Sequence, residues 1–199
     1  ALLESPRGVL DRLTDGAVHQ GVAARIPPYE YADPMDILHD AFHAGVDPFI
    51  VALDGVTDPR NLGAVIRSAA AFGADGVVVP ERRAAGMTAS AWKTSAGAAA
   101  RVPVARATNL TRTLAAYKKA GCTVIGLDMD GDVTIGALDP TTAAGPLVLV
   151  IGGEATGMSR LVRENCDMVA SIVMKDNTES LNAGVAAGIA MYDIARLRD

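Results

Sequence analysis

Short, continuous runs of apolar residues recur along most of this chain, and segments with helical spacing separate them. The clearest runs cover residues 49–53, 76–79, 123–127 and 147–151. A strand that is apolar at every position is typical of a parallel sheet, because both faces of such a sheet are buried. Parallel strands also need long connections, which helices usually supply. The sequence therefore predicts an α/β fold, in which one parallel sheet has helices on both faces.

The remaining elements follow from the same patterns. Further strands are expected at residues 102–105 and 168–173. Helices are expected between the strands and near the end of the chain, over residues 62–72, 88–95, 109–119, 159–165 and 181–197. Residues 128–145 are rich in Asp, Gly and Thr, which predicts a long surface excursion. Because ligands of parallel sheets bind beyond the carboxyl ends of the strands, we expect functional residues in the segments that follow them.

The composition excludes several classes of protein. Half of the 199 residues are hydrophobic, which indicates a packed core and excludes a disordered chain. Aromatic residues make up only 4% of the chain, which limits base stacking as a means of binding RNA. No apolar run approaches the roughly 20 residues of a membrane span. Cys122 and Cys166 match no metal-binding or disulfide pattern. We therefore expect a cytoplasmic protein without a metal and without a membrane partner.

Charge is distributed unevenly along the chain. The net charge is −5, yet residues 60–119 contain ten Lys or Arg and only two acidic residues, a local net charge of +8. Such a segment can be a solvated basic face, or it can attract a phosphate backbone. The charge pattern alone favours the first interpretation, and the motifs described next favour the second.

Three short segments, each beside an expected strand, contain the residues suited to chemistry. They are NLGAVIR at residues 61–67, IGGEATG at residues 151–157 and SLN at residues 180–182. The glycine spacing of the second segment matches neither the dinucleotide fingerprint nor the Walker loop. In this order the three segments resemble the signature motifs of the SpoU (TrmH-like) family of RNA ribose 2′-O-methyltransferases, in the SPOUT superfamily. The resemblance covers most of the chain.

The resemblance implies a function and an architecture. It implies S-adenosyl-L-methionine as cofactor, RNA as substrate, a homodimer, and a deep trefoil knot near the carboxyl end. The segment DGVTDPRN at residues 54–61 and the HQG at residues 19–21 look closest to the bacterial 23S ribosomal RNA guanosine 2′-O-methyltransferases. A transfer RNA ribose methyltransferase of the same family is the alternative. A catalytically silent RNA-binding module on the same fold is the alternative from another class.

The resemblance also assigns roles to single residues. The catalytic set is Arg67, Asn61, Glu154, Ser180 and Asn182, and the cofactor-binding set is Gly152, Ile172 and Leu181. A guanidinium is effectively never deprotonated in a protein, so we expect Arg67 to bind the phosphate beside the target ribose and to stabilise the developing oxyanion. A proton-abstracting role for Arg67 is the alternative.

Structural roles remain open for several of these residues. Asn61 and Ser180 can act as helix N-caps, and Glu154 could cap the amides of residues 158 or 159. Two interior glycines of the last helix, Gly184 and Gly188, predict close packing against another backbone segment, because an interior glycine costs about 1 kcal/mol relative to alanine.

The first 45 residues differ from the rest. They contain the HQG segment and a following Pro-Pro pair, and they look like the junction that follows an amino-terminal RNA-binding domain in some SpoU proteins. We therefore expect residues 1–45 to be such an extension, with the RNA-binding domain missing, and residues 46–199 to be the catalytic domain.

Overall fold

A computed structural model describes residues 2–14, 18–154, 156–175 and 180–198 of the chain. The chain divides into two compact units, Ala1–Glu30 and Tyr31–Asp199. Residues 15–17 of the expected junction and Ala155 of the second motif lie outside the described residues.

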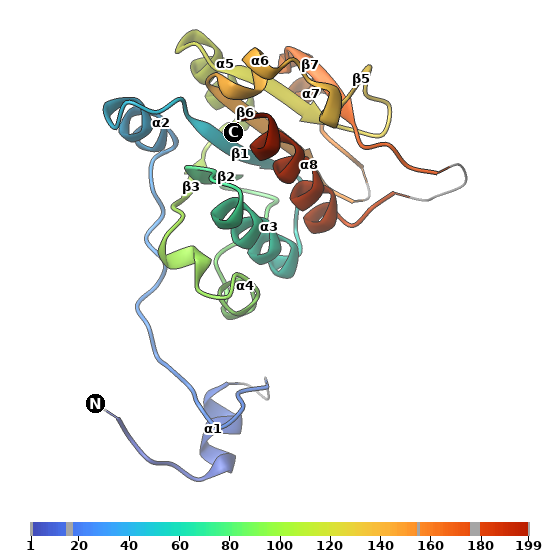
Figure 1. Cartoon of the computed structure of the whole chain (residues 1–199). Helices are drawn as coiled ribbons and strands as arrows, with labels where there is room; N and C mark the ends of the chain where they lie inside the picture. Colours follow the sequence, from blue (N-terminus) through green and yellow to red (C-terminus); the bar gives the residue numbers. More distant parts are fainter. Residues whose placement is uncertain (1, 15–17, 155, 176–179, 199) are drawn as a thin grey trace. The chain divides into compact units, whose positions relative to one another are not determined.

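Within the described residues, the second unit is built on a seven-stranded sheet whose neighbouring strands all run parallel (Figure 1). The strands are β1 (Phe49–Asp54), β2 (Gly76–Pro80), β3 (Val104–Ala107), β4 (Thr123–Leu127), β5 (Val133–Thr134), β6 (Leu147–Gly152) and β7 (Met168–Ser171). Their order is β3-β2-β1-β6-β4-β7-β5. The chain therefore builds the sheet outward from β1 on one side and then adds the later strands on the other side.

Helices cover both faces of the sheet (Figure 1). They are α2 (Pro34–His43), α3 (Pro59–Ala71), α4 (Ala89–Thr94), α5 (Leu110–Lys119), α6 (Pro140–Ala144), α7 (Arg160–Asn165) and α8 (Ala183–Arg198), with short 3₁₀ turns η1 (Ala98–Ala100) and η2 (Ile135–Ala137). Alternate strand residues such as Ile50 and Ala52 pack in one core cluster with residues of α2, α5 and α7. Helices α3, α6 and α8 cover the opposite face. The α/β class and the parallel sheet predicted from the sequence are confirmed.

The prediction for residues 128–145 is wrong in part. This stretch contains β5, η2 and α6, and three of its side chains are buried: Ile135, Leu138 and Ala143. Asp139 is the N-cap of α6: its Oδ1 accepts the backbone N–H of Thr141 at 2.9 Å. These apolar residues are too far apart in the sequence to form a run, so the polar composition predicted a surface segment. In the structure the segment packs at one edge of the core.

Two close helix contacts depend on glycine. A Cβ on Gly63 of α3 would lie 2.6 Å from the carbonyl oxygen of Ala91, so α4, which contains Trp92, packs directly on the α3 backbone. A Cβ on Gly184 of α8 would lie 3.0 Å from the Cβ of Ala64, and one on Gly188 would lie 3.3 Å from Ser68 Oγ. The predicted close packing of the last helix is thereby confirmed, and its neighbour is α3.

The first unit contains the helix α1 (Arg7–Leu13), and no residue of this helix is buried. A hydrogen bond of 3.0 Å joins His19 Nε2 to Asp11 Oδ1, and the backbone N–H of Gly21 donates to His19 Nδ1. The HQG segment is therefore tied to α1 within this unit.

No described helix has both the length and the apolar character that crossing a bilayer requires. Among the same residues, no group of three or more His, Cys, Asp or Glu side chains is placed to hold a metal ion.

Candidate active site

The candidate site lies at the topological switch point of the sheet, where the chain passes from the strands on one side of β1 to those on the other. Strand β1 has β2 on one side and β6 on the other, and such a switch point is where open α/β sheets bind ligands. The segments that follow β1, β4, β6 and β7 meet at this carboxyl edge with the segment that precedes α8. They enclose a larger and a smaller cavity that adjoin each other.

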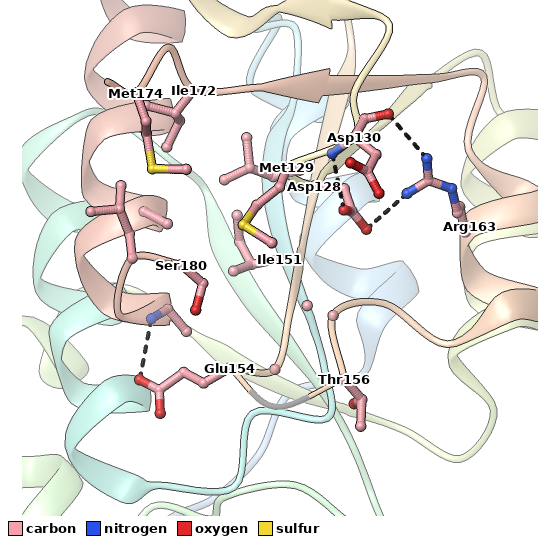
Figure 2. A pocket seen from close by; sticks show the side chains of 17 residues that line it. Asp128, Met129, Asp130, Ile151, Glu154, Thr156, Arg163, Ile172, Met174 and Ser180 are labelled. Carbon is pink, nitrogen blue, oxygen red and sulfur yellow. Dashed lines mark hydrogen bonds and ion pairs between the residues drawn. The ribbon is translucent and has the colours of Figure 1, made fainter. Parts of the chain in front are cut away.

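The larger cavity has a volume of about 540 Å³. Its walls come from residues 127–130 after β4, residues 151–154 and 156–157 after β6, Ile172 and Met174 after β7, and residues 180–181 before α8. All three residues expected to bind the cofactor line it: Gly152, Ile172 and Leu181. Glu154 and Ser180 of the expected catalytic set line it too, and Figure 2 shows their side chains on the same side of the cavity.

The smaller cavity, of about 140 Å³, adjoins the first. It is lined by residues 55–58 after β1 and by Asn61 of α3. Glu154, Thr156 and Ala183 line both cavities, so these residues form a shared wall. The three motifs are therefore brought together at the junction of two adjacent spaces.

One carboxylate oxygen joins the three motifs. Glu154 Oε1 accepts the side-chain amide of Asn61 at 2.8 Å and the side-chain amide of Asn182 at 2.5 Å. It also accepts the backbone N–H of Ala183 at 3.3 Å. Asn182 donates in addition to Asn61 Oδ1 at 3.0 Å. Asn61 is only 8% exposed, so its amide needs these partners.

The structure corrects three capping interpretations. Helix α3 begins at Pro59 and is capped by Asp58, so Asn61 lies inside the helix. Helix α8 begins at Ala183, and Asn182 Oδ1, not Ser180, accepts the N–H groups of residues 184 and 185. Glu154 contacts the start of α8, whereas the N–H of Ser159 donates to Asp54. The sequence offers several side chains able to cap each helix, and the exact start of the helix decides which one does.

Close backbone contacts explain the glycines of the second motif. A Cβ on Gly152 would lie 2.4 Å from the backbone of Gly157 and Met158, and a Cβ on Gly153 would lie 2.4 Å from the carbonyl oxygen of Gly55. Residue 157 itself has a φ of 61°, which favours glycine. These glycines thus let the loop after β6 fold back on itself and against the loop after β1.

Arg67 lies on α3 and is exposed. It is six residues beyond Asn61, which corresponds to about 9 Å along the helix axis. Within the described part of the chain, its guanidinium has no hydrogen bond or ion pair, and it is not among the residues that line either cavity. Arg60, in contrast, forms an ion pair of 3.0 Å with Asp58 at the smaller cavity. The hydrogen bonds from Arg60 hold the pKa of Asp58 below its ordinary value.

A second polar group in the larger cavity belongs to none of the three motifs and was not predicted from the sequence. Asp128 and Asp130 follow β4, and Arg163 of α7 lies beside them (Figure 2). Asp128 Oδ2 lies 2.8 Å from Arg163 Nη1. The expected strand at residues 123–127 already placed Asp128 at a carboxyl end, and that signal was available from the sequence.

Comparisons with known proteins agree with this geometry. The sequence profile of the SpoU rRNA Methylase family matches residues 48–192. A second profile, for RNA 2′-O ribose methyltransferase substrate binding, matches residues 2–32. A curated relative from Mycobacterium sp. (strain KMS), described as an uncharacterized tRNA/rRNA methyltransferase, is 57% identical over 198 residues. That match covers 100% of this chain and 62% of the relative, so the chain spans less than two thirds of the relative's length.

Solved structures give the same result. The SpoU methyltransferase AviRb from Streptomyces viridochromogenes, in complex with AdoMet, has a TM-score of 0.69 and 33% identity, over 77% of this chain and 58% of that one. The AdoMet-bound rRNA methyltransferase from Sinorhizobium meliloti has a TM-score of 0.78 and 26% identity, over 96% of this chain and 70% of that one. With the profile match over residues 48–192, these likenesses establish that the chain belongs to the SpoU methylase family.

Proposed function

We propose that this chain is the catalytic part of an RNA methyltransferase, which uses S-adenosyl-L-methionine to methylate a ribose 2′-hydroxyl. The hydrogen-bond network of Asn61, Glu154 and Asn182 carries the proposal, because it joins three distant motifs at the wall between two cavities. Methyl transfer requires that a donor and an acceptor be held in line at short range. Two adjoining cavities with a common wall suit that requirement.

The larger cavity suits adenosylmethionine. Its volume of about 540 Å³ lies within the range of small-molecule sites. Ile172 and Leu181 offer apolar surface for a purine, and the loop at Gly152 offers backbone polar groups. Bound there, the cofactor would supply a methyl group carried on a sulfonium sulfur. The AdoMet complexes of AviRb and of the Sinorhizobium meliloti enzyme support this assignment.

The smaller cavity suits the acceptor. At about 140 Å³ it is too small for a complete small-molecule ligand, but it suits one part of a large ligand, such as a single ribose of an RNA. We assign Asn61, Glu154, Ser180 and Asn182 to the positioning of that ribose and its hydroxyl. A poor nucleophile such as a hydroxyl must be oriented in this way before it can attack.

Arg67 is assigned to the phosphate beside the target ribose and to the developing oxyanion. Its exposed position on α3 suits a group that arrives from solvent as part of an RNA. A guanidinium remains charged under all ordinary conditions, which favours phosphate binding over proton abstraction.

A basic loop next to the smaller cavity offers further contacts to RNA. Arg82 and Arg83 are exposed in the segment that follows β2. The backbone N–H of Ala85 donates to the carbonyl oxygen of Val56 at 2.8 Å, and Val56 lines the smaller cavity. This hydrogen bond attaches the end of the arginine-containing segment to the wall of the smaller cavity, and we assign the two arginines to backbone phosphates of the RNA.

We also propose that two copies of the chain pair through α8. Val185, Ile189 and Tyr192 lie at helical spacing on one side of α8 and are 52%, 37% and 53% exposed. Phe72, directly after α3, extends this apolar stripe, with its ring centroid 5.9 Å from that of Tyr192. Light scattering tests the pairing: Ile189→Asp should turn a dimer into a monomer, and a wild-type monomer would contradict it.

The substrate we favour is a guanosine of 23S ribosomal RNA, on the likeness of residues 54–61. Transfer RNA is the alternative. Purified protein, tritiated adenosylmethionine and each RNA in turn distinguish the two, followed by nucleoside analysis for 2′-O-methylguanosine. Label in transfer RNA alone would reject our choice, and label on a base would reject ribose methylation.

A silent RNA-binding module on this fold makes a different prediction. Titration calorimetry with adenosylmethionine should then give no heat at high protein concentration. The five retained polar residues of the three motifs favour an enzyme.

The architecture around the site belongs to the same proposal. We infer that residues 46–199 are the catalytic domain and residues 1–45 a junction to an RNA-recruiting part. The substrate-binding profile over residues 2–32 supports that inference. The carboxyl-terminal knot and the cytoplasmic location stay predictions.

A further inference from the structure

The larger cavity has a second polar end, to which none of the three motifs contributes a polar side chain. Figure 2 shows Asp128, Asp130 and Arg163 on one side of the cavity, with Glu154 and Ser180 across from them. Met129 and Ile151 lie between the two ends in this view, and the apolar Ile172 and Met174 line the cavity on a further side. A ligand that fills this cavity must therefore present polar groups at both ends and an apolar portion between them.

The carboxylate of Asp128 is held firmly at this second end. Its backbone N–H donates to the carbonyl oxygen of Ala170 at 2.9 Å, which fixes the chain directly after β4. Its Oδ2 lies 2.8 Å from Nη1 of Arg163, and Nη2 of Arg163 donates to the backbone oxygen of Asp130 at 3.3 Å. The side chain of Asp128 still keeps 23% of its surface exposed. The carboxylate is thus held in place by Arg163 and remains accessible from the cavity.

The loop after β6 leaves space in front of this carboxylate. A Cβ on Gly157 would lie 3.4 Å from Asp128 Oδ2, so a larger side chain at residue 157 would occupy the approach. The glycine, with its φ of 61°, keeps that approach open.

The two ends have different roles if the proposed function holds, and this inference rests on it. The smaller cavity adjoins the larger one at Glu154, Thr156 and Ala183, so an acceptor ribose would meet the methyl group at that end. The Asp128 end must then hold a part of adenosylmethionine that does not react. That part contains three kinds of hydrogen-bond donor: the ribose hydroxyls, the exocyclic amine of adenine and the ammonium of the methionine portion. The purine is assigned above to the apolar surface of Ile172 and Leu181, which leaves the hydroxyls and the ammonium as candidates for Asp128.

The charge at Asp128 favours the hydroxyls. Arg163 Nη1 lies 2.8 Å from Oδ2 of this carboxylate, so an ammonium bonded to the same group would face the guanidinium at close range. A neutral hydroxyl donates to the carboxylate without that repulsion. We propose that Asp128, held by Arg163, binds the ribose hydroxyls of adenosylmethionine and helps to select this cofactor.

Nucleoside binding, measured by calorimetry without RNA, tests the proposal. 5′-Methylthioadenosine keeps the ribose and adenine of the cofactor and lacks the amino-acid portion. Wild-type protein should bind it about tenfold or more tightly than its 2′,3′-dideoxy counterpart, because hydrogen bonds to a charged group are strong. In Asp128→Asn the ratio between the two nucleosides should fall to about threefold or less, since the charge and the pairing with Arg163 are lost.

A matched control lies in the same segment. Asp132→Asn makes the same change of charge at an exposed residue that does not line the cavity, and it should leave the ratio unchanged. Equal affinity of wild-type protein for the two nucleosides would overturn the proposal, whether or not any variant folds. So would an Asp128→Asn protein that loses affinity for adenosylmethionine alone, because Asp128 would then contact the amino-acid portion.

The two proposals fail in different ways. A wild-type protein that discriminates between the nucleosides but methylates no RNA contradicts the proposed function and leaves the role of Asp128 standing. A wild-type protein that methylates RNA but does not discriminate contradicts the role of Asp128 alone.

Discussion

Glu154 and Asp128 follow neighbouring strands, β6 and β4, and line the same cavity, yet they are bonded in different ways. Glu154 takes its hydrogen bonds from two side-chain amides and one backbone N–H, and it has no ion pair with a described residue. Asp128 is paired with the guanidinium of Arg163 at 2.8 Å. One carboxylate is therefore held by amide donors alone, and the other is paired with a cation.

This difference shows how the two ends of one cavity can bind different parts of a ligand. Amide donors orient a carboxylate without cancelling its charge, whereas a guanidinium does both. The Glu154 end is thus suited to the charged, reacting part of a ligand, and the Asp128 end to its neutral hydroxyls.

Arg67→Ala tests whether the reacting end depends on a cation that comes from α3. We expect single-turnover methyl transfer to fall at least about 100-fold, because a charge that stabilises the transition state is lost. The affinity for adenosylmethionine should stay within about tenfold, or about 1.4 kcal/mol, when measured by calorimetry. Arg101→Ala is the charge-matched control, since Arg101 precedes β3 and so lies at the amino-terminal ends of the strands, whereas the site lies at their carboxyl ends. Full activity in Arg67→Ala would refute the assigned role.

Two substitutions at Glu154 separate its charge from its hydrogen bonds. Glu154→Ala leaves the buried amide of Asn61 without its acceptor, so we expect the free energy of unfolding to fall by about 1–3 kcal/mol. Glu154→Gln keeps an acceptor and should cost less than about 1 kcal/mol, yet both variants should transfer methyl groups at least about tenfold more slowly. Urea titration and a single-turnover assay measure the two effects. Normal transfer by Glu154→Gln would show that the charge is not needed, and the contrast with Asp128 would fail.

The basic loop should affect the RNA and leave the cofactor unaffected. The double variant Arg82→Ala, Arg83→Asn should bind RNA about tenfold more weakly, and the slope of log affinity against log salt should shrink by about 2, since two cations are removed. Asn is chosen at residue 83 because the backbone there has a φ of 58°. Arg112→Ala, on α5 at the opposite face, serves as the control. An unchanged salt slope would exclude this loop from the RNA-binding surface.

The two glycines of α8 test how far the Glu154 network depends on the contact with α3. Gly184→Ala should destabilise the protein by about 1–2 kcal/mol, since the new Cβ would lie 3.0 Å from that of Ala64, which cannot rotate away. Gly188→Ala should change stability by less than about 0.5 kcal/mol, because Ser68 Oγ can rotate and alanine favours the helix. Thermal unfolding measures both, and equal effects would contradict this account of the interface.

The strands were the most predictable part of the molecule. The runs at residues 49–53 and 147–151 are apolar because both faces of β1 and β6 are buried, and no turn residue interrupts them. Residues 128–145 could not be predicted in this way. Their buried side chains are isolated among Asp, Gly and Thr, and only the packing of α6 and η2 against α8 makes them part of the core.

The site was predicted unevenly for a related reason. Motif spacing brought Asn61, Glu154 and Asn182 to attention, and the fold places them in one network. Asp128 and Arg163 are 35 residues apart and belong to no motif, and their pairing exists only because α7 lies beside the segment after β4. Contacts of that kind depend on tertiary packing, which a pattern along the chain does not encode.

The contact between α4 and α3 has a practical consequence for spectroscopy. Trp92 on α4 is the only tryptophan of the chain, so light absorbed at 295 nm is re-emitted from that one position. Helix α4 rests on Gly63, two residues beyond Asn61 in the same helix. The emission of Trp92 would therefore respond to a shift of α3. A change in the larger cavity would alter this emission only if it moved α3.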